Sequence, residues 1–417
     1  MKKLIAMITM LTVIFITITI FSSCQSLFDG LDANQSGDEN QGGDENQGGD
    51  ENQGGDESQG GDESQGGDES QGGDENQDGD QSESPTDSTD FLSYRQINDF
   101  YAVSLSETVA NVPKDVVIPS EYNGLPVAHI EGFFNSPIES ITLPDTTKII
   151  AFGAFRNCTS LKRVIINTDS AYINEDSFAG CTALEYNTHE GLRYFGSEEQ
   201  PYLYLVGIDP FDEETRTAYT LHDSTTVILP AAFKNNFVLT NVNLPKTLKS
   251  ISQYAFQNCR SLTEITIPEG LESLSPMAFY DCHSLKTIYF NARKLKDVSS
   301  NRSNIFTNCS RQAEIIVGKE VERIPSNIFT CFDLQGSFVA LRFEEGSVCK
   351  SIGEGAFANS FVSVVYLPGS ITSIEAFAFL GGYSKMYYDG SKDELEKIEI
   401  FPKSHVSIDS IICKDTP

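Results

Sequence analysis

The sequence predicts a solenoid of stacked short repeats, preceded by a disordered acidic linker. Three observations support this prediction: an internal repeat of about 23 residues, fixed apolar positions within each repeat, and a run of acidic residues confined to the chain before Phe91. A single short repeat cannot bury its own apolar face, so neighbouring repeats must stack into one continuous core.

The N-terminus has the order of features found in an export signal. Lys2 and Lys3 precede an apolar or Thr-containing run over residues 4–20, and the segment ends in Phe-Ser-Ser-Cys24. Small residues before a cysteine resemble a bacterial lipobox, which implies cleavage after residue 23 and acylation of Cys24. The alternative is a plain membrane-spanning anchor, because the run approaches the length that crosses a bilayer. We expect an exported, membrane-anchored lipoprotein, located in the outer membrane and exposed on the cell surface.

Residues 24–90 form the acidic linker after the lipid-bearing cysteine. No Lys or Arg occurs between Lys3 and Arg95, and a six-residue period, GDENQG and then GDESQG, runs from Gly37 to Asp80. Each period adds two carboxylates and no apolar side chain, so we expect a disordered spacer with a reach of roughly 40 to 50 Å. A low-affinity calcium tract is the alternative, but the glycine and aliphatic pattern of calcium-binding β-rolls is absent.

The repeats share an Ala-Phe pair, a Cys three residues after the Phe, and a Leu three residues further on. Successive Phe positions are often 23 residues apart, as from Phe155 to Phe178 and from Phe256 to Phe279. The full motif occurs at Phe155/Cys158/Leu161, Phe178/Cys181/Leu184, Phe256/Cys259/Leu262 and Phe279/Cys282/Leu285, and Phe233, Phe306, Phe329, Phe357 and Phe379 fall in the same frame. We expect the phenyl rings to stack as a spine inside the solenoid.

One unit shows how the predicted strand is built. Residues 262–267 have leucine-rich-repeat spacing, which points Leu262, Ile265 and Ile267 inward and the residues between them outward. Pro268 lacks an N–H for the strand ladder and ends the strand. A second inward stretch follows from Leu271 to Leu274, before the turn at the next Ala-Phe pair.

These units resemble the BspA-like, or Treponema-type, leucine-rich repeats of bacterial surface proteins. The resemblance extends to residues 115–127, 191–207 and 387–413, which are similar to the opening, inserted and closing segments of that family. It implies a leucine-rich-repeat solenoid with a parallel β-sheet on one face and short strand, turn and 3-10 segments opposite. The expected order is a cap over residues 91–137, the solenoid over 138–383 with an insertion at about 186–222, and a closing segment over 384–417. Several members of the family are adhesins that bind host matrix proteins or other bacteria.

The sequence departs from the repeat pattern at several places. Asn236, Phe332 and Ser360 stand where other units carry the turn cysteine, and the units ending at Phe306 and Phe357 are stretched. We therefore expect the regular geometry of the stack to change locally at these units.

The cysteines and histidines do not form a recognisable catalytic or metal-binding pattern. Cys24 is the expected lipid site, and the cysteines at the repeat position, including Cys309, are expected to fill buried turns. Cys331, Cys349 and Cys413 lie off the pattern, which leaves one disulfide among them open. The chain contains no CxxC, HxxxH or GxSxG motif. We expect no catalytic residue, no metal site, no cofactor and no enzymatic activity.

The outward strand positions are the candidate partner-binding surface, because Arg and Tyr are enriched at binding hot spots. The candidate residues are Lys162, Arg163, Ile165, Asn241, Asn243, Glu264, Thr266, Lys286, Tyr289 and Tyr366. We expect a monomeric, lipid-anchored scaffold or adhesin whose solenoid face binds host matrix proteins, cell-surface proteins or other bacteria. The net charge of -31 argues against a nucleic-acid partner.

Two other functions remain open from the sequence. One is a carbohydrate-active or other hydrolytic enzyme with a site in the insertion, where carboxylates would converge near Glu198, Asp209 or Glu213. The other is a structural coat protein without a discrete ligand. A pocket with facing carboxylates would favour catalysis, and a shallow continuous face would favour binding.

Overall fold

The structure is a computed structural model that describes residues 91–106, 111–210, 215–298, 304–310, 312–330 and 339–414. The expected signal peptide, Cys24 and the acidic linker lie outside the described residues. Residues Thr89–Pro417 form one compact unit. Both hydrophobic clusters described below lie within this unit, so it contains its own core. Among the described residues, no helix is both long enough and apolar enough to cross a membrane.

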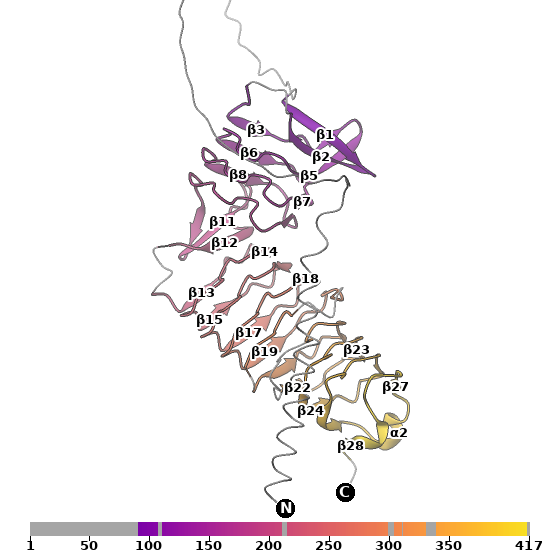
Figure 1. Ribbon diagram of the computed structural model, residues 1–417. Helices are drawn as coiled ribbons and strands as arrows, with labels where there is room; N and C mark the ends of the chain where they lie inside the picture. Colours follow the sequence, from indigo (N-terminus) through magenta and orange to yellow (C-terminus); the bar gives the residue numbers. More distant parts are fainter. Residues whose placement is uncertain are drawn as a thin grey trace, which may run out of the picture. The chain divides into compact units, whose positions relative to one another are not determined.

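The fold is the predicted parallel β-solenoid, with one strand per turn contributed to a long sheet face (Figure 1). Three groups of parallel strands, paired within each group, make up this strand face. In chain order they are β3 (Asp115–Val117), β6 (Ser140–Leu143) and β8 (Arg163–Ile166); β13 (Ala218–Thr220) and β15 (Asn241–Asn243); and β17 (Glu264–Ile267), β19 (Thr287–Phe290), β20 (Glu314–Val317), β22 (Val339–Phe343), β24 (Val362–Leu367), β26 (Tyr383–Tyr388) and β28 (Ile411–Cys413).

Very short strands form a second parallel face. They are β7 (Ile149–Ile150) and β9 (Tyr172–Ile173); β14 (Val227–Ile228), β16 (Ser250–Ile251) and β18 (Ser273–Leu274); and β21 (Arg323–Ile324), β23 (Ser351–Ile352), β25 (Ser373–Ile374) and β27 (Glu399–Ile400). Apart from the three strands of the insertion, the remaining elements are the cap strands β1 (Leu92–Ile97), β2 (Phe100–Leu105), β4 (Glu121–Tyr122) and β5 (Leu125–Ile130), the helix α2 (Lys392–Leu395) and the 3-10 turn η1 (Ile408–Ser410).

The side chains of a typical unit point as its sequence predicts. Ile265 and Ile267 of β17 are buried, whereas Glu264 and Thr266 are exposed. β17 pairs with β19 in parallel, with Glu264 opposite Thr287. The second inward stretch is also confirmed, because Leu271 and Leu274 are buried. Alternation along each strand therefore gives every turn one core side and one solvent side.

A ladder of phenylalanine rings runs through the core, as predicted. Phe256 lies with its ring centroid 4.9 Å from those of both Phe233 and Phe279, and the planes of Phe256 and Phe279 differ by 2°. The ladder continues with spacings of 5.2 to 5.5 Å through Phe306, Phe329, Phe357 and Phe379. These spacings are close to the distance between neighbouring strands, so each turn adds one ring without leaving a gap.

Most turns around a ring have a residue in left-handed backbone conformation on each side of the Phe. Tyr254 and Asn258 flank Phe256 at two residues' distance, with φ of 60° and 62°. Asn, Asp or Gly holds the later of these positions in most turns, because these residues tolerate positive φ best. A reversal of this kind lets the chain leave the ring and re-enter the next strand within a few residues.

The repeat cysteine is a hydrogen-bond donor between turns. Cys282 Sγ donates to the carbonyl oxygen of Phe256 at 3.1 Å. Burial raises the pKa of the Cys282 thiol, which keeps the proton on the donor. Ser360 replaces the cysteine in a later turn, and its hydroxyl donates to the Phe329 carbonyl at 2.8 Å. The cysteine position is thus a buried donor position, which explains why serine can occupy it.

The other departures at this position differ in their outcome. Asn236 accepts hydrogen bonds through Oδ1 from the backbone N–H groups of Val238 and Leu239. Its side-chain oxygen therefore stabilises the turn that contains Asn236, whereas the repeat cysteine bonds to the preceding turn of the solenoid. Phe332 and Cys331 lie outside the described residues. Cys349 and Cys413 are buried, unbridged thiols, so no disulfide joins these two.

The insertion lies between the N-terminal and C-terminal turns of the solenoid. Strands β10 (Asn187–His189), β11 (Leu192–Phe195) and β12 (Tyr204–Ile208) form an antiparallel sheet, and β12 then pairs in parallel with β14. Leu192 and Tyr194 belong to the hydrophobic cluster of the C-terminal turns. Phe195 and Tyr204 belong to the cluster of the N-terminal turns. The insertion strands therefore contribute side chains to both hydrophobic clusters and lie between them.

Removal of one ring from the ladder should be strongly destabilising. Phe256 is 0% exposed and contacts a ring on each side, so Phe256→Ala should lower the free energy of unfolding by about 3 to 5 kcal/mol. The matched control is Phe237→Ala, because Phe237 is 52% exposed. Urea unfolding followed by circular dichroism measures both. Equal losses of unfolding free energy in the two variants would show that the phenylalanine ladder does not stabilise the core.

Candidate binding face

One row of outward side chains on the strand face is rich in aromatic and aliphatic groups. Strand pairing places Tyr289 beside Ile316, Ile316 beside Arg342, Tyr366 beside Tyr387, and Tyr387 beside Ile412. We call Tyr289, Ile316, Arg342, Tyr366, Tyr387 and Ile412 the aromatic row. It crosses six consecutive strands, from β19 to β28.

Contacts within the aromatic row hold its side chains in place. The Arg342 guanidinium lies 4.3 Å from the centroid of the Tyr366 ring and forms an ion pair with Glu314. The Tyr366 and Tyr387 rings stack at 5.1 Å with planes 12° apart. Tyr366 is still 37% exposed and Ile412 is 43% exposed. Arg342, Tyr366 and Tyr387 are therefore pre-organised for a partner, because little of their side-chain freedom remains to be lost on binding.

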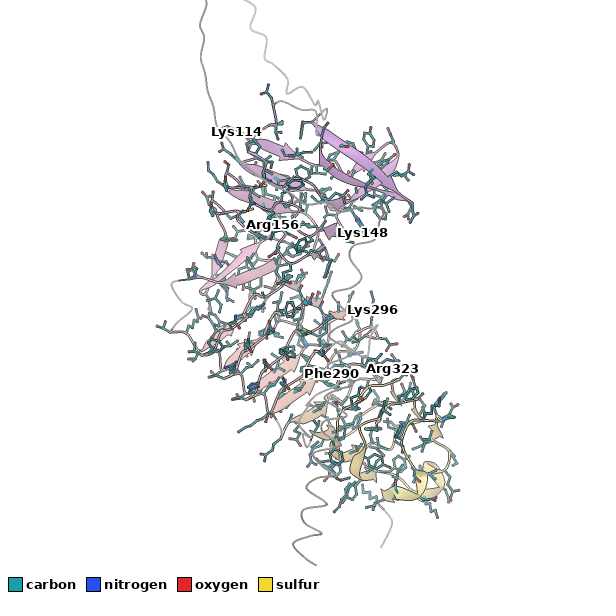
Figure 2. All side chains as sticks on the ribbon, in the orientation of Figure 1. Lys114, Lys148, Arg156, Phe290, Lys296 and Arg323 are labelled. Atoms are coloured by element: carbon teal, nitrogen blue, oxygen red, sulfur yellow. The ribbon has the colours of Figure 1, made fainter. Side chains whose placement is uncertain are left out.

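The N-terminal strands of the face carry charge instead of aromatic groups. Glu139 accepts a hydrogen bond from Lys162 at 2.8 Å and pairs with Lys114 at 2.6 Å. Lys114, labelled in Figure 2, comes directly before β3. Hydrogen bonds from Lys114 and Lys162 lower the pKa of the Glu139 carboxyl to about 2. Arg163 pairs with Glu198 of the insertion at 2.9 Å. These cations are exposed, and each already has a carboxylate partner.

A cavity of about 800 Å³ lies where the insertion meets the N-terminal strands. Asp145, Asp169, Glu198 and Glu199 line it, but Asp209 does not. Asp169 pairs with Lys249 at 2.6 Å, and Glu198 pairs with Arg163. Glu213 lies outside the described residues. Within the described part of the chain, no three His, Cys, Asp or Glu side chains are grouped closely enough to hold a metal ion.

The comparison with protein families settles the type of repeat. Six copies of the BspA type leucine rich repeat region match this chain, over residues 129–199, 226–344 and 331–411. The chain belongs to this family of BspA-type leucine-rich repeat proteins. The matched ranges cover both sides of the insertion, in agreement with the repeat positions read from the sequence.

Several solved structures also match. A leucine rich cell surface protein from Faecalibacterium prausnitzii is 19% identical, with 77% of this chain and 97% of that chain covered and a TM-score of 0.28. A leucine-rich repeat protein from Eubacterium ventriosum is 18% identical, with coverage of 68% and 90% and a TM-score of 0.36. The pneumococcal vaccine antigen PcpA is 16% identical, with coverage of 79% and 98% and a TM-score of 0.31. No curated protein matches the chain.

The ten candidate residues all lie at the surface of this BspA-type solenoid, but they do not form one site. Ile165, Asn241 and Tyr289 are partly buried and the other seven are exposed. Thr266 and Tyr289 are direct neighbours on paired strands, and Tyr366 lies further along the same row. The candidates on β8 are separated from those on β15 by the insertion strands. The remaining candidates are Lys162, Arg163, Asn243, Glu264 and Lys286, which lie on or beside β8, β15, β17 and β19.

Four members of the aromatic row are absent from the sequence-based candidates. Arg342 lies in a stretched unit and Ile316 follows one, so a constant 23-residue step from Tyr289 reaches neither. Tyr387 and Ile412 lie in the closing segment, which the structure shows to continue the strand face through β26 and β28. Short runs of apolar and aromatic residues, at 386–388 and 411–413, were the available signal for these two strands.

The charge cluster at Glu139 gives a pH prediction. Because the folded pKa of about 2 lies below the ordinary value of 4.5, Glu139 stabilises the fold above pH 4.5, and this contribution is lost as the pH falls through about 2. A carboxyl ¹³C NMR titration of residues 89–417 should place its midpoint near pH 2. Lys162→Ala should raise the midpoint, whereas Lys385→Ala, on β26, should not. A midpoint near 4.5 in the unmodified chain would contradict the geometry.

Proposed function

We propose that this protein is a lipid-anchored, surface-displayed binding scaffold, an adhesin that uses the strand face to bind matrix proteins, cell-surface proteins or other bacteria. The aromatic row carries the proposal. It combines three tyrosines, an arginine and two isoleucines on one ordered surface, which is the composition typical of the centre of a protein interface. Membership of a repeat family whose strands present one continuous face is consistent with this use.

The sequence before the solenoid supports display at a distance from a membrane. The lipobox-like Cys24 provides a site for acyl chains, and two chains are enough for stable anchoring. The acidic linker of about 66 residues gives a reach of roughly 40 to 50 Å between lipid and solenoid. A binding face carried on such a spacer can meet large partners without steric conflict with the membrane.

Binding accounts for the ordered surface better than hydrolysis does. A glycosidase needs two carboxylates that face each other across a substrate. In the acidic cavity beside the insertion, Asp169 and Glu198 are each engaged by a cation. The aromatic row, by contrast, presents exposed Tyr366 and Ile412 outside the core. We therefore propose recognition, not catalysis, as the role of the solenoid.

Substitution in the aromatic row should weaken partner binding. Residues 89–417 should bind saturably to at least one member of a panel of purified matrix proteins, intact bacteria and glycans. Tyr366→Ala and Arg342→Ala should each weaken that binding by at least about tenfold, because a hot-spot side chain contributes about 2 kcal/mol or more. Biolayer interferometry measures the affinities for soluble partners.

The matched control is Tyr172→Ala, because Tyr172 is 44% exposed but lies on β9 of the second face. Its affinity should stay within about twofold of the unmodified protein. Folded protein that binds no member of the panel, or equal losses in the Tyr172 and Tyr366 variants, would contradict the proposal. Circular dichroism confirms that each variant is folded.

A further inference from the structure

A groove of about 640 Å³ runs beside the C-terminal part of the aromatic row. Tyr366, Tyr387 and Ile412 form one side of it. The loop from Glu344 to Ser347 forms another part of its wall. The groove is therefore continuous with the surface proposed above to bind a protein partner, and the following inference rests on that proposed function.

The groove exists because one connection between the two faces is longer than its neighbours. Seven residues, 344–350, join β22 to β23, whereas five residues join β20 to β21 and five join β24 to β25. Gly346 takes φ of +75°, and a Cβ at this residue would meet no atom within 4 Å, so the loop tip stands in open space. With its two extra residues, this loop forms one wall of the groove, beside Tyr366 and Tyr387.

The charges along the groove are unbalanced. Arg342 is paired with Glu314, and Lys414 is paired with Asp389 at 2.7 Å. Within the described part of the chain, Glu344 and Glu345 form no ion pair. One oxygen of Glu344 accepts the backbone N–H of Lys319 at 3.0 Å, which fixes the carboxylate at the base of the loop. The groove thus presents two carboxylates that lack a cation, beside an aromatic wall.

We propose that this groove binds the basic side chain of an extended segment of a partner protein. The aliphatic stem of an Arg or Lys would pack against Tyr387 and Ile412, while its charged head would donate to Glu344 and Glu345. Arg suits the site better, because its planar guanidinium can bridge two carboxylates. The net charge of -31 attracts a basic partner and opposes association of a second copy of this chain.

The test uses a fluorescein-labelled peptide, Gly-Ser-Arg-Leu-Arg-Ser-Gly, and a second peptide with Glu in place of both Arg residues. Fluorescence anisotropy with residues 89–417 at physiological salt measures the dissociation constants. We expect saturable binding of the Arg peptide and none of the Glu peptide. The double variant Glu344→Gln/Glu345→Gln should weaken Arg-peptide binding by at least about tenfold, in the range typical of a desolvated charge pair.

The matched control is Glu396→Gln/Glu399→Gln, which removes the same charge from exposed residues at α2 and β27. This control should stay within about twofold of the unmodified protein. Equal weakening in both double variants would show nonspecific attraction and overturn the inference. Failure of the Arg peptide to saturate, or equal binding of the Glu peptide, would also overturn it.

Two further outcomes separate this inference from the proposed function. If a matrix or bacterial partner loses affinity with Tyr366→Ala but keeps it with Glu344→Gln/Glu345→Gln, the groove inference alone fails. If light scattering shows a dimer that Ile412→Ser converts to a monomer, a second copy of this chain occupies the groove, and the inference also fails. Retention of affinity by Tyr366→Ala would instead overturn the proposed function itself.

Discussion

The match between two spacings governs this solenoid: phenyl rings that stack at about 4.9 to 5.5 Å, and parallel strands that repeat at about 4.8 Å. One ring per turn fills the core only if successive turns stay in register. A register shift by one residue would turn the inward side chains outward and bury the polar ones. The ladder therefore fixes the direction of every strand side chain, and with it the composition of the exposed face.

The insertion supplies apolar side chains where the phenylalanine ladder is interrupted. Phe178 contacts Phe195 at 5.1 Å with planes tilted by 56°, and the parallel stacking resumes only from Phe233 to Phe256. Strands β11 and β12 contribute apolar residues to the clusters on both sides, so each core has an apolar neighbour at the interruption. The same strands separate a charged N-terminal part of the face from an aromatic C-terminal part.

Period and alternation were enough to predict the fold, because each inward residue recurs at a constant step. The inward positions of the 262–274 unit and the phenylalanine spine are confirmed. The proposed binding surface matches the residues expected from the sequence only in part. Arg342 and Tyr387 do not follow a constant step, since Arg342 lies in a stretched unit and Tyr387 lies in the closing segment. The groove depends on a connection two residues longer than its neighbours and on ion pairs between residues more than 20 positions apart, which no local pattern reveals.

Recognition by the aromatic row is the central claim, and amide hydrogen exchange tests it most directly. Residues 89–417 would be measured alone and with the tightest-binding protein of the panel. The account predicts slower exchange on binding in peptides that cover β19 to β28, with little change in β3, β6 and β8. Protection confined to those N-terminal strands or to the second face, with β22 to β28 unchanged, would contradict it.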